Sequence, residues 1–337
     1  MMYANKNNQI SKNRPLVSIV LLAYNGKRYI HECAYAIANQ SYKNVEIIVV
    51  DNGSTDGSVH ALKTSFPNWV YIDHKDNIGF TGGMNSGIES AKGDYIVPLG
   101  VDVYLNKDFV DNCVRIMKTR PKVGALGANE YKWINGQLTE ELRMPGPAYF
   151  NRFRIKGVTC KIDTPIAPSF GVTGSFPFLR RKALIEIKRL DGHIYDPVFF
   201  CGWDDIDLWW RMQLRGWECY ATTETKAWHV GSSYDNEKQS FIAKSTHYQS
   251  WIMRNRWFLI LKNIPSLLLL LLSPILLVHE IALPFYFLFR SPRTLRAWHS
   301  SWREIRVSLP AIYAKRCLIQ KSRKVQLSQI MRWFRGI

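Results

Sequence analysis

Short apolar runs alternate with amphipathic stretches over the first hundred residues of the chain. The runs are Val17–Ala23 (VSIVLLA), Val45–Val50 (VEIIVV), Val70–Asp73 and Tyr95–Leu99 (YIVPL). Continuous apolar runs of this length, rich in β-branched residues, are typical of strands buried in a parallel sheet. The intervening segments predict helices over Lys27–Gln40 and Ser58–Ser65. The pattern therefore predicts an α/β fold with an open, mostly parallel sheet flanked by helices.

Two aspartates directly follow predicted strands. Asp51 ends the second run, and Asp102 comes just after the fourth. Ligands of open α/β sheets bind outside the carboxyl ends of the strands, so we expect both acids to face one crevice. A carboxylate there can hold a divalent cation against a diphosphate leaving group. The alternative for Asp102 is a simple cap for a helix over Asn106–Met117.

An acidic triplet, Asp204, Asp205 and Asp207, begins a predicted helix that Gly216 ends. Acids at a helix start are favoured by the helix dipole alone, which is the structural explanation. The aromatic neighbours Trp203 and Trp209 suggest a second, functional explanation. Aromatic surroundings can raise a carboxyl pKa so that the group serves as a general base, and aromatic faces stack on sugars.

Two further features are ambiguous by themselves. His229, in the segment WHVGSS, is either a packing residue or a ligand. The glycine-rich segment Gly79–Asn85 (GFTGGMN) predicts a loop that approaches something closely, but it matches neither a phosphate-binding Walker loop nor a dinucleotide fingerprint.

In their order and spacing these residues resemble the family-2 inverting glycosyltransferases of the GT-A fold, with a rhamnosyltransferase-like stretch at NIGFTGGMN. The resemblance covers about residues 15–233 and weakens towards 263. It implies that Tyr24 and Asp51 contact the donor nucleotide, and that the glycine-rich segment lies beside the donor. The donor-binding residues implied are Tyr24, Asp51, Asn77, Gly79, Gly83 and Asn85.

The same resemblance implies roles for the remaining residues. Asp102 and His229 would bind a divalent metal, Mg²⁺ or Mn²⁺. Asp205 would be the general base, supported by Asp204. The acceptor would meet Gly174, Trp203 and Trp209.

Two departures from the family pattern qualify these roles, and a motif of the family's processive members is absent. Gly100 replaces the first acid of the metal-binding D-x-D, and Asp204 replaces the usual glutamate of the Glu-Asp motif, which leaves open whether Asp204 or Asp205 is the base. Gln249 and Arg256-Trp257 are too far apart for the Q-x-x-R-W of processive members, which favours addition of one sugar.

The charge of the chain is uneven. The formal net charge is +18, and the segment from Arg254 onward carries 15 basic residues against Glu280 and Glu304, or +13. Such a segment is typical of proteins that meet a polyanion, either nucleic acid or an anionic membrane. Its apolar stretches Ile264–Val278 and Ile281–Phe289 favour the membrane. Because Pro274, His279-Glu280 and Pro284 interrupt them, they predict a helical hairpin lying in one leaflet rather than a span.

Further basic residues are interleaved with Trp298, Trp302, Trp333 and Phe334, which we expect in the headgroup layer. The six cysteines form no C-x-x-C pair and predict reduced, buried thiols, and the polar first 13 residues predict no secretory signal peptide. Both features indicate the cytoplasmic face of the cell membrane, with peripheral or monotopic attachment.

The resulting prediction is an enzyme that moves one sugar, from dTDP-rhamnose or a UDP-sugar, to a hydroxyl of a lipid-linked saccharide in cell-surface polysaccharide assembly. No nucleic-acid partner is expected. We expect a tail over 1–14, a catalytic domain over 15–235 with nucleotide-binding and acceptor halves meeting at about 102, and a membrane-docking segment over 236–337. The alternatives are a nucleotidyltransferase on a similar sheet and a basic nucleic-acid-binding protein.

Overall fold

The computed structural model describes residues 14–144, 147–151, 156–159, 164–231 and 241–334. Its strands are β1 (Val17–Ala23), β2 (Val45–Asn52), β3 (Val70–His74), β4 (Tyr95–Gly100), β5 (Val103–Leu105), β6 (Val123–Ile134), β7 (Gln137–Met144), β8 (Pro147–Asn151), β9 (Lys156–Thr159), β10 (Ile166–Ser169), β11 (Phe178–Arg180) and β12 (Glu218–His229). Its α-helices are α2 (Ile30–Ala38), α3 (Ser58–Ser65), α4 (Gly79–Ser90), α5 (Phe109–Lys118), α6 (Arg181–Asp191), α7 (Asp204–Leu214), α8 (Thr246–Asn263), α9 (Ser266–Arg290), α10 (Pro292–Lys321) and α11 (Leu327–Met331). Short 3₁₀ turns are η1 (Pro197–Phe199) and η2 (Phe241–Ala243).

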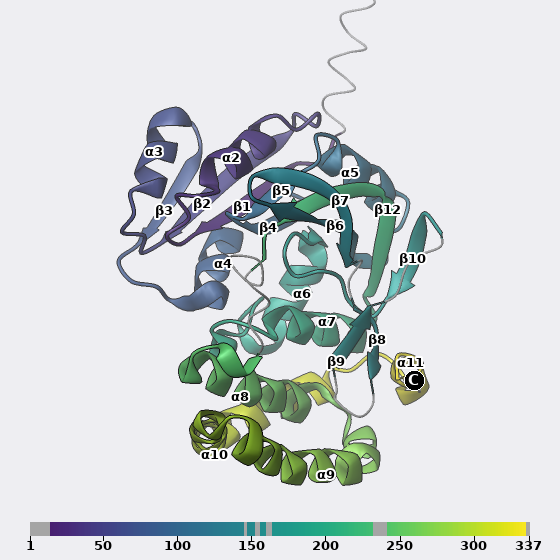
Figure 1. Cartoon of the computed structure of the whole chain (residues 1–337). Helices are drawn as coiled ribbons and strands as arrows, with labels where there is room; N and C mark the ends of the chain where they lie inside the picture. The colour runs from purple at the N-terminus through teal and green to yellow at the C-terminus, as the bar shows by residue number, and fades with distance from the viewer. Residues whose placement is uncertain (1–13, 145–146, 152–155, 160–163, 232–240, 335–337) are drawn as a thin grey trace, which may run out of the picture.

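A mixed sheet runs through the molecule in the order β10-β12-β6-β11-β4-β1-β2-β3, with β5 and β7 pairing at its side (Figure 1). The half formed by β4, β1, β2 and β3 is parallel. The other half is mixed, because β11 is antiparallel to both β4 and β6, whereas β12 is parallel to β6. The predicted α/β fold with a mostly parallel, helix-flanked sheet is confirmed.

Side chains of one strand feed two cores, one on each face of the sheet. Along β1, Val20 and Leu22 enter the core under α4, α6 and α7, while Ile19 and Leu21 enter the core under α2 and α5. All seven residues of β1 are buried, as expected for a central parallel strand.

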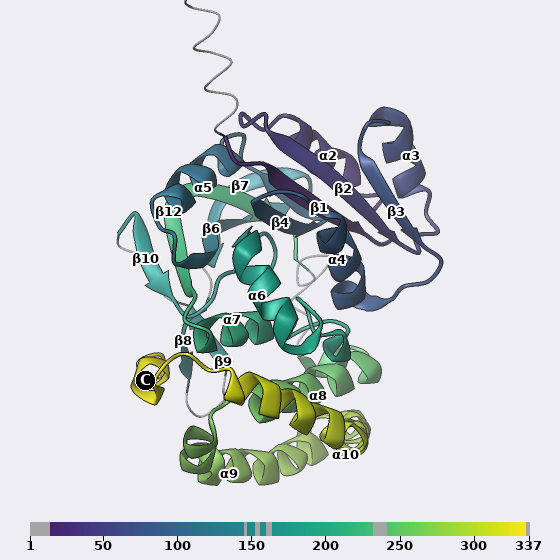
Figure 2. The same ribbon diagram turned by 180° about the vertical axis from the view of Figure 1, so that it is seen from behind.

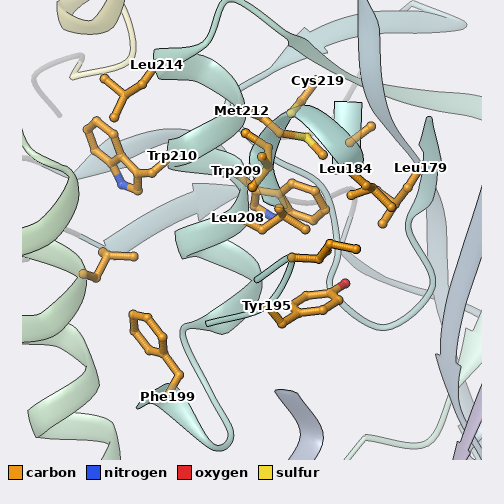
Figure 3. Packing of buried hydrophobic residues seen from close by; sticks show 14 of the residues in the cluster. Leu179, Leu184, Tyr195, Phe199, Leu208, Trp209, Trp210, Met212, Leu214 and Cys219 are labelled. Atoms are coloured by element: carbon orange, nitrogen blue, oxygen red, sulfur yellow. The ribbon is translucent and has the colours of Figure 1, made fainter. Parts of the chain in front are cut away.

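Helix α7 is the centre of the first core. Figure 3 shows Leu208, Trp209, Trp210 and Met212 projecting from it among side chains of the sheet and of neighbouring loops. Trp210 also contacts Phe334, at 5.9 Å between ring centroids, and Phe170 contacts Trp333 at 6.1 Å. The expectation that Trp333 and Phe334 face lipid headgroups is therefore wrong, because they pack against this core.

The helices α8, α9 and α10 form a further layer beyond α7, on the side away from the sheet (Figures 1 and 2). A buried charge network fastens this layer: Lys262 of α8 lies 2.7 Å from Asp196 and 2.8 Å from Asp207 of α7. Lys315 of α10 contacts the other oxygen of Asp196 at 2.5 Å. Because the side chains of Lys262, Asp196 and Asp207 have no exposed surface, fully desolvated ion pairs tie the helical layer to α7 and to the segment before η1.

The predicted hairpin of two apolar helices is wrong. Both stretches belong to one helix, α9, which continues through Pro274 and Pro284. Glu280 does not mark a turn because it pairs with Arg256 of α8 at 2.6 Å, so the polar residues face the protein. Within the described residues, α9 is the one helix long and apolar enough to cross a membrane, with a mean hydropathy of 2.2 in its best window, of which 22% is buried.

Two smaller expectations also need correction. The glycine-rich segment from Gly79 is not a loop but the first turns of α4. Of the described cysteines, Cys33, Cys113 and Cys219 are buried as expected, whereas Cys201 and Cys317 are exposed; all five are free thiols.

Candidate active site

The acidic residues of α7 follow a strained loop. Phe200 and Trp203 adopt positive φ angles of 59° and 68°, which non-glycine residues rarely accept. Asn255 of α8 holds this loop, because its amide donates to the carbonyl oxygens of Phe199 at 2.8 Å, Cys201 at 3.0 Å and Gly202 at 2.9 Å. The C-terminal helical layer thus fixes the loop from which Asp204 and Asp205 emerge.

The three acids of the triplet have different surroundings. Asp207 is fully buried and bonded to Arg211 at 2.8 Å, to Asn263 at 2.7 Å and to Lys262, so it is a structural residue. Asp204 is 5% exposed, and Asp205 is partly exposed. Asp204 and Asp205 are therefore the two acids of the triplet that remain available for chemistry.

The pKa values of Asp204 and Asp205 are both raised. Burial raises the pKa of Asp205. Burial, followed by repulsion from the Asp205 carboxylate, raises the pKa of Asp204 further. Asp205 is thus the first of the two to lose its proton as pH rises, and Asp204 is the one that keeps it.

A second polar cluster surrounds His229 at the end of β12. Its Nε2 lies 3.1 Å from Oδ2 of Asp102, and its Nδ1 lies 2.9 Å from Oε1 of Glu130. Arg143 pairs with the same Glu130 oxygen at 3.0 Å. Burial opposes a charge on the imidazole, but the hydrogen bonds to Asp102 and Glu130 outweigh it and raise the pKa of His229 to about 9.

One short segment, residues 173–175, lies between the two clusters. The Thr173 hydroxyl donates to Glu130, and Ser175 Oγ lies 3.0 Å from Nδ1 of His229. Gly174 between them lies against Asp205, since a Cβ built on this glycine would be 2.6 Å from Oδ2 of Asp205. The Asp102–His229 pair and the acids of α7 are therefore two walls of a single site.

The arrangement around His229 fits a divalent cation. Oδ2 of Asp102 and Nε2 of the imidazole converge, whereas Nδ1 faces Glu130, Arg143 and Ser175, so a neutral ring with its electron pair on Nε2 would present that atom to a metal. Among the described residues, no group of three or more His, Cys, Asp or Glu side chains is arranged to hold a metal. A cation here would take its other ligands from diphosphate and water.

Tyr24 directly follows β1, and Asp51 is the next-to-last residue of the neighbouring parallel strand β2, where it pairs with Ala23 of β1. Tyr24 is exposed, and Asp51 lines a small cavity of about 180 Å³ together with His60 and Asp73. Oδ1 of Asp51 accepts from the Ser54 amide at 2.8 Å, which orients the carboxylate.

Four residues predicted to contact the donor instead make hydrogen bonds or close packing contacts with other parts of the chain. Asn77 accepts from the Gly79 amide at 2.9 Å, and Gly79, at φ +80°, lies against Phe200. Gly83 lies against Leu22 of β1, where a Cβ would be 2.5 Å from the Leu22 side chain. Asn85 is paired with the backbone of Tyr195 at 2.6 and 2.9 Å. Gly83 and Asn85 thus serve packing in this structure, and we do not retain them as donor contacts.

The predicted acceptor residues also differ from one another. Gly174 lies beside Asp205, as described above, and Trp203 is half-buried directly before the acids. Trp209 is fully buried, and its indole donates to the carbonyl oxygen of Val172 at 3.1 Å. With no exposed face, Trp209 cannot stack on a sugar here; it supports the 173–175 segment from behind.

Comparison with known proteins assigns the family. Residues 18–187, half of the chain, match the model of glycosyl transferase family 2. The chain therefore belongs to this family and is a glycosyltransferase.

Relatives and solved structures agree with this assignment. The chain is 32% identical over 120 residues, 35% of its length, to an uncharacterized glycosyltransferase of Haemophilus influenzae, covering 37% of that protein. It is 34% identical over 134 residues, 35% of its length, to chondroitin synthase of Pasteurella multocida, covering 14% of that protein. The mannosyltransferase PcManGT from Pyrobaculum calidifontis, in complex with GDP-Man and Mn²⁺, shares the fold with a TM-score of 0.51 at 18% identity, covering 94% of both chains. The matches to these relatives span little more than a third of their length at most.

Proposed function

We propose that this glycosyltransferase transfers one sugar, with inversion, from a nucleotide-diphosphate-sugar to a hydroxyl of a lipid-linked saccharide at the cytoplasmic face of a membrane. The rhamnosyltransferase-like stretch NIGFTGGMN favours dTDP-rhamnose over a UDP-sugar as the donor. The observation that carries the proposal is the 173–175 segment, which contacts Glu130 and His229 on one side and Asp205 on the other.

The chemistry assigned to the α7 wall is proton transfer. Asp205 accepts the proton of the acceptor hydroxyl as its oxygen attacks the anomeric carbon from the face opposite the diphosphate. A single displacement of this kind inverts the anomeric configuration. Asp204, protonated at neutral pH, adds no negative charge beside the attacking oxygen and supports Asp205.

On the opposite wall, Asp102 and His229 would hold Mg²⁺ or Mn²⁺, which neutralises the charge of the departing diphosphate. Mn²⁺ accompanies GDP-Man in the related mannosyltransferase structure, which supports a metal in this role. Tyr24 and Asp51 would position the nucleotide base, with Asn77 and Gly79 shaping the adjoining start of α4.

The membrane part of the proposal rests on α9 and α10. Large apolar side chains protrude from the outer face of α9, among them Leu270 at 68% and Phe289 at 82% exposure. An exposed apolar face of this extent is typical of a membrane contact. The basic residues of α10 add attraction to anionic headgroups. The division into a catalytic domain to about 235 and a docking segment beyond it remains a prediction.

The test is a donor panel. The purified chain is incubated with dTDP-rhamnose, UDP-glucose, UDP-galactose and GDP-mannose, with Mn²⁺ and membranes that contain polyisoprenyl-linked saccharides. We expect release of dTDP and transfer of rhamnose to the lipid fraction. Turnover of UDP-glucose in preference to dTDP-rhamnose would contradict the donor assignment, and transfer only to water-soluble acceptors would contradict the lipid linkage.

A further inference from the structure

A partly open, largely apolar cavity lies between the helical layer and the active-site loop. It has a volume of about 490 Å³, within the range of small-molecule sites, and is bounded by α8, α9 and α10. Its walls are mostly aromatic and aliphatic, including Met253 and Trp257 of α8, Leu283 and Phe287 of α9, and Trp302 of α10.

Trp203 connects this cavity to the catalytic centre. The residue lines the cavity and directly precedes Asp204 and Asp205. Its φ of +68° and the hold of Asn255 on the preceding carbonyl oxygens fix its position. A molecule in the cavity would therefore lie beside Trp203, the residue directly before helix α7, which carries the proposed general base Asp205.

The other side of the cavity borders the exposed apolar face of α9. Leu283 and Phe287 face inward, whereas Leu277 and Phe285, on the same helix, are 62% and 61% exposed. The same helix therefore presents apolar side chains both to the cavity and to the outer surface, where a membrane would lie.

The polar groups of the cavity wall include the Arg256–Glu280 ion pair, in which the two charges offset each other, and two further groups that suit an anionic lipid. Arg290 lines the cavity at the end of α9, is exposed, and forms no ion pair with a described residue. The Trp298 indole N–H is buried and finds no acceptor in the described part of the chain. An exposed cation on the cavity wall and an N–H donor without an acceptor among the described residues both match a phosphate-bearing molecule.

We infer that this cavity binds the hydrocarbon chain of the acceptor lipid, a single-chain polyisoprenyl phosphate or diphosphate whose saccharide reaches Asp205. The inference rests on the proposed lipid-linked acceptor. A single chain suits a cavity of this volume better than a two-chain phospholipid does. Because Trp203 lies next to the proposed catalytic acids, the lipid that best fits this position is the one that carries the acceptor hydroxyl.

The probe is farnesyl phosphate, and its binding to the full chain is measured by calorimetry, independently of sugar transfer. Leu283→Trp and Met253→Trp fill the cavity from opposite walls. Leu277→Trp, on the outer face of α9, is the matched control. We expect wild type and control to bind alike and the two filled variants to bind at least about tenfold more weakly, with unchanged donor-nucleotide affinity in all four proteins showing that they are folded.

Two outcomes would overturn the inference: no binding of farnesyl phosphate to wild type, or equal binding by wild type and both filled variants. Displacement of the probe by phosphatidylglycerol vesicles would also overturn it, since the cavity would then be a general lipid site. Each of these results leaves the donor panel unaffected, so failure of the inference is distinguishable from failure of the proposed function.

Discussion

Gly174 and Asp205 approach so closely that a methyl group at position 174 would lie 2.6 Å from the Asp205 carboxylate. Such a contact is shorter than van der Waals packing allows, so any other residue at 174 must displace the carboxylate or the segment that carries Thr173 and Ser175. Because those two hydroxyls contact Glu130 and His229, the displacement would reach both walls of the site.

Gly174→Ala is therefore expected to reduce kcat by at least about 10²-fold, the scale of a misplaced catalytic group. Gly136→Ala is the control, because nothing lies within 4 Å of a Cβ there, although its φ of +78° costs about 1–2 kcal/mol of stability. Steady-state kinetics and thermal melting of both variants check this. Equal activity of Gly174→Ala and wild type would show that the close contact has no catalytic meaning.

Removal of the metal should abolish transfer. We expect EDTA to inactivate the enzyme, Mn²⁺ to restore it, and Asp102→Ala to remain inactive with either. Glu130→Gln keeps the size of the side chain but weakens the hold on His229, so its affinity for Mn²⁺ should fall by about 10–100-fold. Mn²⁺ binding is followed by calorimetry and by electron paramagnetic resonance. Full activity of Asp102→Ala in excess EDTA would refute metal dependence.

Asp51→Ala should weaken binding of the free nucleoside diphosphate. Loss of a hydrogen bond to a carboxylate costs about 1.5–3 kcal/mol, or roughly 10–100-fold in Kd. Asp111→Ala removes a partly exposed acid on α5, serves as the control and should bind as wild type does. Calorimetric titration with dTDP and UDP measures both. An unchanged Kd for Asp51→Ala would mean that the nucleotide base lies elsewhere.

The pH dependence of kcat follows from the raised pKa of Asp205. A general base works only when deprotonated, so kcat should rise with pH through the pKa of Asp205, above the ordinary value of about 4 for an aspartate. Measurements between pH 4.5 and 9 on the wild type should show this rising limb, with stability followed at each pH by circular dichroism. A kcat that stays constant down to pH 4.5 would be inconsistent with Asp205, whose pKa is raised, as the base.

The first half of the fold was readable from the sequence because its strands are local apolar runs. The predicted strand at Val17–Ala23 and the predicted helix at Ser58–Ser65 agree with the structure residue for residue. The sequence predicts a loop at the glycine-rich start of α4, since glycine lowers helix propensity, whereas the structure has a helix there. The glycine content of α4 is explained by tertiary packing, because Gly83 allows the helix to lie directly on β1.

The missed residues depend on contacts between distant segments. Glu130 lies 99 positions from His229, and Asn255 lies more than 50 positions from the carbonyl groups that it holds. No local pattern marks either one. The polar residues Thr173 and Ser175 on either side of Gly174 are a recognisable signal of a functional segment. The sequence does not show that their partners are Glu130 and His229. The hairpin prediction failed for the same reason, because the Arg256–Glu280 pair needs α8 in place.

The most direct test of the account is a paired measurement of kcat for Asp205→Asn and Asp204→Asn, with donor affinity as the folding control. We predict that Asp205→Asn loses about 10²–10⁴ in kcat with an unchanged Kd for the donor. Asp204→Asn should keep most of its activity, because Asp204 is protonated at neutral pH and asparagine resembles it. An inactive Asp204→Asn beside an active Asp205→Asn would contradict the assignment of the base.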